Sequence, residues 1–317
     1  MAKSRIYFIS DVHGSNRCFR KFLNAAGFYK ADILILGGDI TGKVMTPIIE
    51  GGDGSFRCTY QGSDLVLKNN EEVEEFRKKA ADSGSYTTLV SQSEFKELEV
   101  DPAKVTELFR RLMVERLRDW ISLAEERLGK TSVKCFISPG NDDISDLDPI
   151  LDSSPYVVNP EGRVVEIDGE HEMITLGYTN HTPWNSPREV DEDVLALKIS
   201  GMAEKVQNMK SAIFNIHVPP IDTPIDQAPR VDKNLRIVVK AGSVEIISAG
   251  SSACRAAIMK YQPMIGLHGH IHESRGIVRL GRTMSVNPGS EYGEGILRSF
   301  IADLEGEKIK SYLLASG

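Results

Sequence analysis

Short apolar runs recur along this chain of 317 residues, and each of them ends at a polar cluster. Runs of four to eight apolar residues bounded by turn residues are typical of buried strands. Amphipathic helical stretches separate the first four runs, and short strands with Gly-rich turns follow from Gly276 to Leu314. The pattern predicts an α/β fold in α/β/β/α layers, with residues 1–317 forming a single domain. The six runs are RIYFIS, DILILGGD, VKCFISPGNDD, MITLGYTNH, AIFNIH and MIGLHGHIH.

Residues 43–130 interrupt this alternation between the second and third runs. The segment begins Gly-rich and becomes strongly charged and helical. Asp101 and Pro102 form an N-cap and first-turn signature, an apolar stripe follows, and Gly129 marks the stop of one long helix. We therefore expect a mostly helical insertion, with a lid or a partner surface as its two candidate roles.

The amino-acid composition disfavours membrane, disulfide-rich, zinc-cluster and nucleic-acid-binding proteins. No stretch approaches the about 18 consecutive apolar residues that span a bilayer, and the N-terminal apolar run is too short for a signal peptide, so we expect a cytoplasmic protein without membrane contact. Four scattered cysteines without a C-x-x-C pair indicate neither a disulfide framework nor a zinc cluster. The net charge of −7 disfavours nucleic acid as a partner without ruling it out, and a homo-oligomer remains open.

Polar side chains follow five of the apolar runs. A single Asp-x-His after a strand is often only a turn. A ligand site is indicated instead by the ordered set of seven residues together with the glycines beside them. In α/β sheets such strand ends form the ligand-binding crevice. Imidazole and carboxylate ligands suit Mn, Fe, Zn or similar ions, so we predict a site for two divalent metals. The seven residues are Asp11, His13, Asp39, Asn141, His217, His270 and His272.

The ordered set DVH, GGD, GND, NIH and GHIH resembles the calcineurin-like metallophosphoesterases, whose pattern is D-x-H, G-D, G-N-H-D/E, H and G-H-x-H. The resemblance runs from Ile6 to about Ser290, apart from the insertion. The stretches TPWNSPRE, HVPPIDTPID and GLHGHIHES resemble a prokaryotic branch of small phosphoesterases. The resemblance implies that Asp39 bridges two metals. It assigns Asp11, His13 and His272 to one metal, and Asn141, His217 and His270 to the other.

The same resemblance implies that a hydroxide bridging the two ions hydrolyses a small phosphate ester, with phosphodiesters favoured. Asp39, Asn141 and Asp142 are the candidate catalytic residues. Asp142 replaces the family's histidine, which contacts phosphate or acts as general acid, so we expect an anion there and the best rates on activated diesters. Two alternatives remain: a catalytically weak scaffold or interaction protein of the same fold, which Asp142 favours, and a nuclease, which the acidic charge disfavours.

Three other histidines match no ligand position in the motifs. We expect His268 to be structural or to lie behind the ligands. His171 and His181 are expected in surface or loop positions, and His181 is also a candidate for the wall of a substrate pocket.

Overall fold

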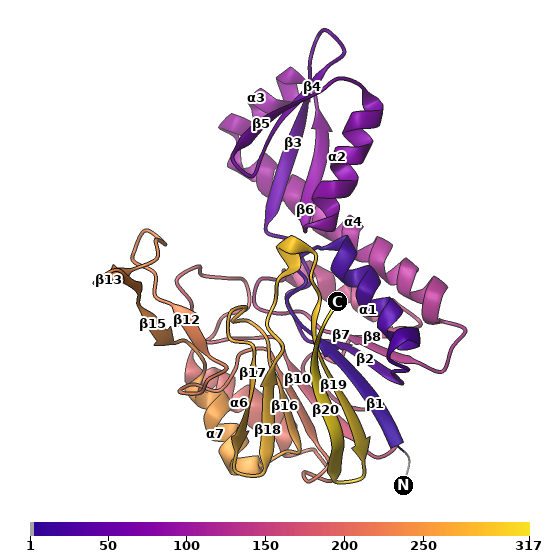
Figure 1. Ribbon diagram of the computed structural model, residues 1–317, viewed down its shortest axis with the longest axis vertical. Helices are drawn as coiled ribbons and strands as arrows, with labels where there is room; N and C mark the ends of the chain where they lie inside the picture. Colours follow the sequence, from indigo (N-terminus) through magenta and orange to yellow (C-terminus); the bar gives the residue numbers. More distant parts are fainter. Residues whose placement is uncertain (1–2) are drawn as a thin grey trace.

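Two six-stranded sheets packed face to face form the centre of the structure, a computed structural model that describes residues 3–317 (Figure 1). The first sheet has the order β20-β19-β1-β2-β7-β8, with bounds Lys308–Ser316, Arg298–Glu305, Lys3–Ile9, Ile33–Leu36, Lys134–Ile137 and Val157–Val158. The second has the order β17-β18-β16-β11-β10-β9, with bounds Gly276–Leu280, Thr283–Asn287, Ile265–Leu267, Ile213–Ile216, Glu172–Leu176 and Val164–Glu166.

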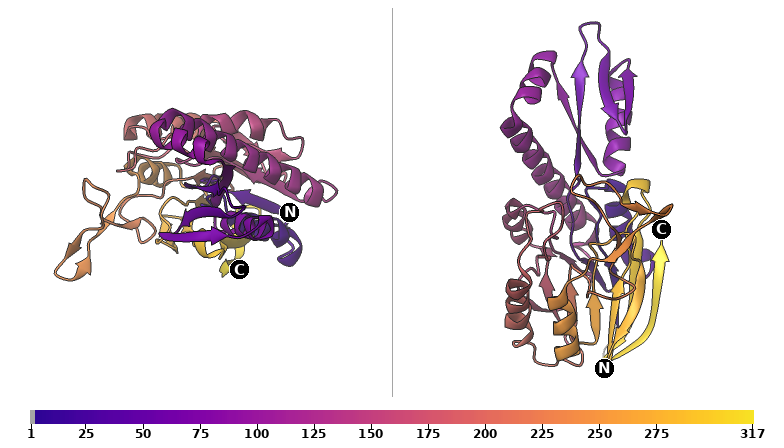
Figure 2. Two further views of the ribbon diagram at one scale, coloured as in Figure 1. Left: turned by 90° about the horizontal axis from the view of Figure 1, so that it is seen from above. Right: turned by 90° about the vertical axis from the view of Figure 1, so that its left-hand side faces the viewer.

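Helices cover the outer face of each sheet, which confirms the predicted α/β/β/α layers (Figure 2). Along β1 the side chains alternate, as the period of two in a strand requires. Ile6 and Phe8 face the second sheet, whereas Tyr7 and Ile9 face the helices. On the first sheet lie α1, α4 and α5, with bounds Asn16–Phe28, Pro102–Leu128 and Asp148–Asp152; on the second lie α6 and α7, with bounds Glu192–Ala203 and Ser252–Tyr261.

The parallel strands carry the site. β1, β2, β7 and β8 run parallel in one sheet, and β10, β11, β16 and β18 run parallel in the other. Their carboxyl ends therefore point toward one edge of the sandwich, where the loops that follow β1, β2, β7, β11 and β16 meet.

The insertion forms a lobe above the sandwich (Figure 1). Helices supply most of its regular structure, as predicted, but it also contains a four-stranded sheet in the order β5-β4-β3-β6 that the sequence analysis did not predict. Its own small core includes Ile48, Phe56 and Phe76. The strands β3 to β6 span Val44–Glu50, Phe56–Tyr60, Ser63–Leu67 and Ser85–Val90, and the helices α2 and α3 span Asn70–Asp82 and Gln92–Val100.

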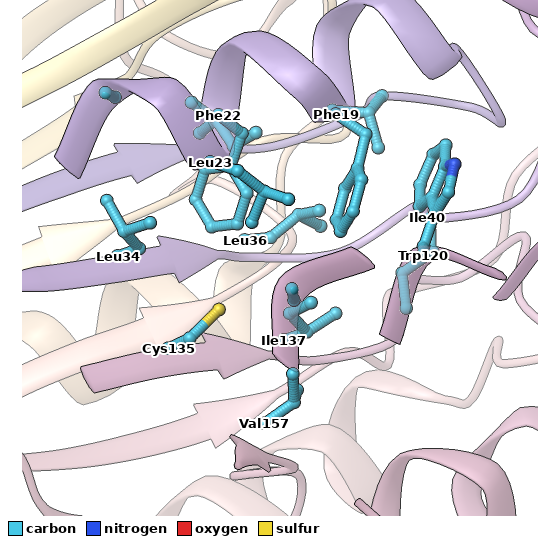
Figure 3. Close-up of a cluster of buried hydrophobic side chains, with 14 of the residues drawn as sticks. Phe19, Phe22, Leu23, Leu34, Leu36, Ile40, Trp120, Cys135, Ile137 and Val157 are labelled. Atoms are coloured by element: carbon cyan, nitrogen blue, oxygen red, sulfur yellow. The ribbon is translucent and has the colours of Figure 1, made fainter. Parts of the chain in front are cut away.

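Helix α4 joins the lobe to the sandwich. Its C-terminal half buries Leu117, Trp120 and Ala124 in the core against α1 (Figure 3). The Trp120 indole stacks on the Phe19 ring, with centroids 4.2 Å apart and an interplanar angle of 4°, and its Nε1 donates a hydrogen bond to Asn16 Oδ1 at 2.6 Å. The end of the insertion is therefore part of the main core.

A second projection, which we call the arm, comprises residues 227–248 and extends sideways from the second sheet (Figure 2). Its strands pair as two short antiparallel ribbons, β12 with β15 and β13 with β14. The bounds of β12, β13, β14 and β15 are Gln227–Pro229, Val239–Lys240, Ser243–Val244 and Ile246–Ser248. Among the helices of residues 3–317, none combines the length and the apolar character that crossing a membrane requires.

Replacing Trp120 by alanine should lower the free energy of unfolding by about 3–5 kcal/mol, because the change leaves a cavity beside Phe19 and removes the bond to Asn16. Urea unfolding followed by circular dichroism measures this loss. Trp184→Ala is the matched control, since that side chain is 60% exposed and its removal should change stability by less than about 0.5 kcal/mol. Equal losses in the two variants would contradict the packing described for α4.

Candidate metal centre

The structure brings all seven predicted side chains to the shared edge of the two sheets. Each follows a strand: β1 delivers the first two, β2 and β7 one each, β11 one, and β16 the last two. Ligand atoms of Asp11, His13, Asp39 and His272 all lie within 4.8 Å of one another. Buried imidazole and carboxylate groups at this spacing form a cluster that could hold a metal ion.

Asp39 lies between two groups of donor atoms. Its Oδ2 is 3.5 Å from His13 Nε2, on the side of Asp11 and His272. Its Oδ1 is 3.4 Å from His217 Nε2 and accepts a hydrogen bond from the backbone N–H of Asp142 at 3.0 Å. The two oxygens of one carboxylate therefore face different histidines.

The remaining predicted ligands lie on the Oδ1 side. Asn141 Oδ1 is 2.7 Å from His270 Nδ1. The His217 Nε2 atom that approaches Asp39 also lies 3.8 Å from Asp11 Oδ1, which links the two groups. The centre thus contains two carboxylates, four imidazoles and one amide oxygen, a donor set that suits Mn, Fe or Zn.

Backbone carbonyls fix the orientation of two of the histidines. His13 Nδ1 lies 3.2 Å from Thr41 O, and His217 Nδ1 lies 3.1 Å from Gly37 O. Because a carbonyl oxygen only accepts, each Nδ1 carries a proton, and Nε2 is the ring nitrogen that faces the cluster and can bind a metal once it is not protonated. His217 Nε2 is buried without a hydrogen-bond partner in the described part of the chain. An unpaired imidazole nitrogen directed at two carboxylates fits a metal ligand.

Four of the seven residues have left-handed backbone conformations. The φ angles are 57° at Asp11, 38° at His13, 52° at Asp39 and 66° at His270. Non-glycine residues adopt this region rarely and at a cost of about 1–3 kcal/mol each. Backbone hydrogen bonds between the loops hold it, including His13 N to Asp39 O at 3.0 Å. Four of the eleven non-glycine residues with a left-handed backbone in residues 3–317 are therefore candidate ligands.

Close approach explains two of the glycines that precede ligands. A Cβ at Gly140 would lie 2.3 Å from Asp39 Oδ1, and one at Gly269 would lie 2.3 Å from Asp11 Oδ2. Any side chain at either position would displace a carboxylate. The backbone therefore approaches the candidate ligands closely at both glycines.

The buried charges stabilise one another. Burial alone would raise the pKa of Asp39, but His217 and His13 outweigh it and hold the pKa well below its usual value. Burial alone would lower the pKa of His217, but Asp39 and Asp11 raise it to about 9. A bound cation would take the place of the His217 proton, so metal binding should release a proton and weaken as pH falls.

Lys43 is a candidate site residue that the sequence analysis missed. Its Nζ lies 2.5 Å from Asp142 Oδ2, at the side of the metal cluster. Asp142 Oδ1 also accepts hydrogen bonds from Ser186 Oγ at 2.6 Å and from Asn141 Nδ2 at 2.9 Å. Asp142 is therefore paired and not an isolated anion. The available signal was a lysine four residues after Asp39, directly behind a glycine.

Asp143 ties two ligand loops together. Its carboxylate accepts hydrogen bonds from the backbone N–H groups of Ile40, Thr41 and Gly140 at 2.8–2.9 Å, and from Thr41 Oγ1 at 2.7 Å. These contacts join the loop that carries Asp39 to the loop that follows β7. Asp143 thus positions the ligands without lying among them.

The other histidines have different environments. His268 is fully buried, with Nδ1 2.8 Å from Ile216 O, behind the ligands. His171 lies in the loop before β10, one of the two kinds of position expected, but it is fully buried there, between Asp168 Oδ2 and Gly306 O at 2.7 Å each. Its two hydrogen bonds satisfy both ring nitrogens, which allows burial. His181 is exposed and lies 3.0 Å from Asp191.

A cavity of about 180 Å³ opens beside the cluster. Within the described residues, Lys43 is the sole member of segment 43–130 that lines it. A lid role for the insertion therefore stays a prediction. The cavity is lined by Asp39, Lys43, Asn141, Asp142, Thr182, Trp184, Ser186, His270, His272 and Glu273.

Comparison with solved structures supports the fold at full length. A protein of known crystal structure aligns over 99% of both chains with a TM-score of 0.57 and 18% identity, and TT1561 of Thermus thermophilus aligns over 100% of this chain and 99% of its own with a TM-score of 0.51 and 14% identity. Together with the layers and the ordered residues at the strand ends, these matches identify the architecture. This chain has the metallophosphoesterase fold.

Sequence comparison gives less detail. No family model matches the chain. The uncharacterized protein MJ1162 of Methanocaldococcus jannaschii is 30% identical over 152 residues, which are 47% of this chain and 61% of that protein. This match spans less than two thirds of the relative and adds no activity to the metallophosphoesterase fold.

Asp39→Asn should remove most of the bound metal, because the amide nitrogen cannot act as a ligand toward one of the two groups that the carboxylate faces. We expect metal affinity to fall by more than about 100-fold, since changes behind the ligands already cost 10–100-fold. Elemental analysis and calorimetric metal titration measure this. Asp191→Asn, at an exposed side chain, is the matched control and should keep full metal content, whereas His268→Ala, behind the ligands, should have a much smaller effect than Asp39→Asn. Full occupancy in Asp39→Asn would show that Asp39 does not bridge.

Proposed function

We propose that this chain hydrolyses phosphate esters with the help of two divalent metal ions, and that phosphodiesters are its preferred substrates. The observation that supports this most strongly is the position of Asp39 between two groups of donor atoms. Asp11, His13 and His272 would hold one ion with Asp39. Asn141, His217 and His270 would hold the other with Asp39, as the motif resemblance implies.

Two such ions supply a water of lowered pKa and an electrophilic clamp for a phosphoryl group. The protein supplies the positions. The strained turns and the loop contacts of Asp143 fix the ligands before substrate arrives, so little reorganisation is needed. The cavity beside the cluster gives the phosphoryl group a place next to His270 and His272.

Lys43 would bind a phosphoryl oxygen from the side of the cavity. Its ammonium group is held by Asp142, which is itself fixed by Ser186 and Asn141. The pair places a positive group beside the substrate at a site where the family pattern has a histidine. The negative charge of Asp142 is offset in the same contact, so the repulsion expected from the sequence is reduced.

The preference for diesters follows from charge. A diester carries one negative charge and an ionised monoester carries two, while the cavity is also lined by the carboxylates of Glu273 and of Asp142, whose charge Lys43 offsets only in part. The second charge of a monoester would be repelled more strongly there. The scaffold alternative rested on Asp142 in place of the family's histidine, and the contact that brings the Lys43 ammonium group to Asp142 favours the enzyme over it.

The decisive experiment combines elemental analysis of the purified protein with a Mn-supplemented screen of nitrophenyl mono- and diesters. About two metals per chain with faster hydrolysis of diesters would support the proposal. A protein with no bound metal and no turnover would be a scaffold of the same fold. Turnover of single-stranded or duplex DNA above that of nitrophenyl diesters would instead identify a nuclease.

Lys43→Ala should lower kcat/KM for nitrophenyl diesters by about 10–100-fold, because a charge-assisted contact of about 1.5–3 kcal/mol is lost. Metal content should not change, since Lys43 offers no lone pair to an ion while protonated. Lys43→Arg should recover part of the rate. Lys130→Ala, at an exposed lysine after α4, is the control and should behave as wild type. Wild-type kcat/KM in Lys43→Ala would exclude the phosphate contact.

A further inference from the structure

A second and larger cavity adjoins the metal centre. Its volume is about 570 Å³, against about 180 Å³ for the cavity at the cluster. The two share four lining residues, Thr182, Trp184, His270 and Glu273. A group bound at the cluster can therefore extend directly into the larger cavity.

The walls of the larger cavity are mostly apolar. The arm forms one wall with Val231, Leu235, Ile237 and Ile247. Ile271 lies between the two ligand histidines of the G-H-I-H motif and contributes from the side of the cluster. Pro183, Trp184 and Ile221 add to the apolar lining, together with Ala228, Pro229 and Ala249.

Several of these apolar side chains are exposed to water. The exposed fraction is 60% for Trp184, 55% for Ile237, 48% for Leu235 and 40% for Ile247. Large apolar side chains that gather around one concave surface are typical of a binding site. A volume of about 570 Å³ also lies within the range of small-molecule sites.

We propose that this cavity, which we call the arm cavity, binds an apolar organic group of the substrate, so that the substrate class is phosphodiesters that carry an alkyl or aryl group. The inference rests on the proposed function, because the phosphoryl group must sit at the metal cluster. The continuity of the two cavities favours this occupant: Trp184 and His270 line both, so one ligand can contact both.

Alkylphosphonates of increasing chain length test the proposal without requiring turnover. Each has one phosphonate for the metal cluster and one alkyl chain for the arm cavity. Calorimetry with the Mn-loaded full chain should show that affinity rises about two- to fourfold per methylene from methyl- to hexylphosphonate, as expected for apolar surface leaving water.

Variants on the arm separate the cavity from the cluster. Ile237→Ser and Leu235→Ser should flatten the dependence on chain length and leave the affinity for methylphosphonate unchanged, because both residues line only the larger cavity. Val244→Ser is the matched control, since Val244 is 45% exposed on the same arm and does not line the arm cavity. It should retain the wild-type dependence.

The possible results distinguish a failure of the arm-cavity proposal from a failure of the proposed function. If methylphosphonate binds but affinity is independent of chain length, the arm cavity does not hold the organic group and this inference is overturned. A change of oligomeric state in Ile237→Ser, measured by light scattering, together with that result would show that a second copy of the chain covers the cavity. If methylphosphonate fails to bind the Mn-loaded protein, the proposed function falls and this inference falls with it.

Discussion

The two carboxylate oxygens of Asp39 face different histidines, Oδ2 toward His13 and Oδ1 toward His217. The rest of the site depends on that arrangement. It requires a left-handed backbone at Asp39 and a neighbouring glycine at position 140, because a Cβ there would strike its Oδ1. It also requires the loops after β2 and β7 to lie at a fixed spacing, which the four hydrogen bonds of Asp143 provide. The sandwich contributes by ending its parallel strands at one edge.

The ligand positions could be predicted from the sequence because they follow from local rules. A buried strand ends where its apolar run ends, and parallel strands bring such ends together. Asp11 and His217 are 206 residues apart in sequence, yet their meeting requires only that β1 and β11 end at the same edge. The seven candidate ligands could therefore be named without knowledge of the loops between them.

Contacts that form where a long segment of the chain returns to the sandwich could not be predicted from the sequence. Lys43 reaches Asp142 only because the chain turns at the start of the insertion beside the loop after β7. The sheet of the lobe was missed because its strands are partly exposed and not continuous buried runs, and β5 has no fully buried position. The burial of His171 in its loop was not predicted because one of its two partners, the carbonyl of Gly306, follows β19 and is 135 residues away in the sequence.

Helix α4 gives the lobe a mechanical connection to the site. Its 27 residues correspond to about 40 Å of rigid helix, with one end in the lobe and the other in the main core. Midway along it, Arg116 Nη1 donates to Gly14 O at 2.6 Å, one residue from His13, and Ser15 Oγ donates to Asp82 O of the lobe at 2.6 Å. Any tilt of the lobe would therefore displace the loop that carries Asp11 and His13. A movement far from the metal centre would in this way change the positions of these two candidate ligands.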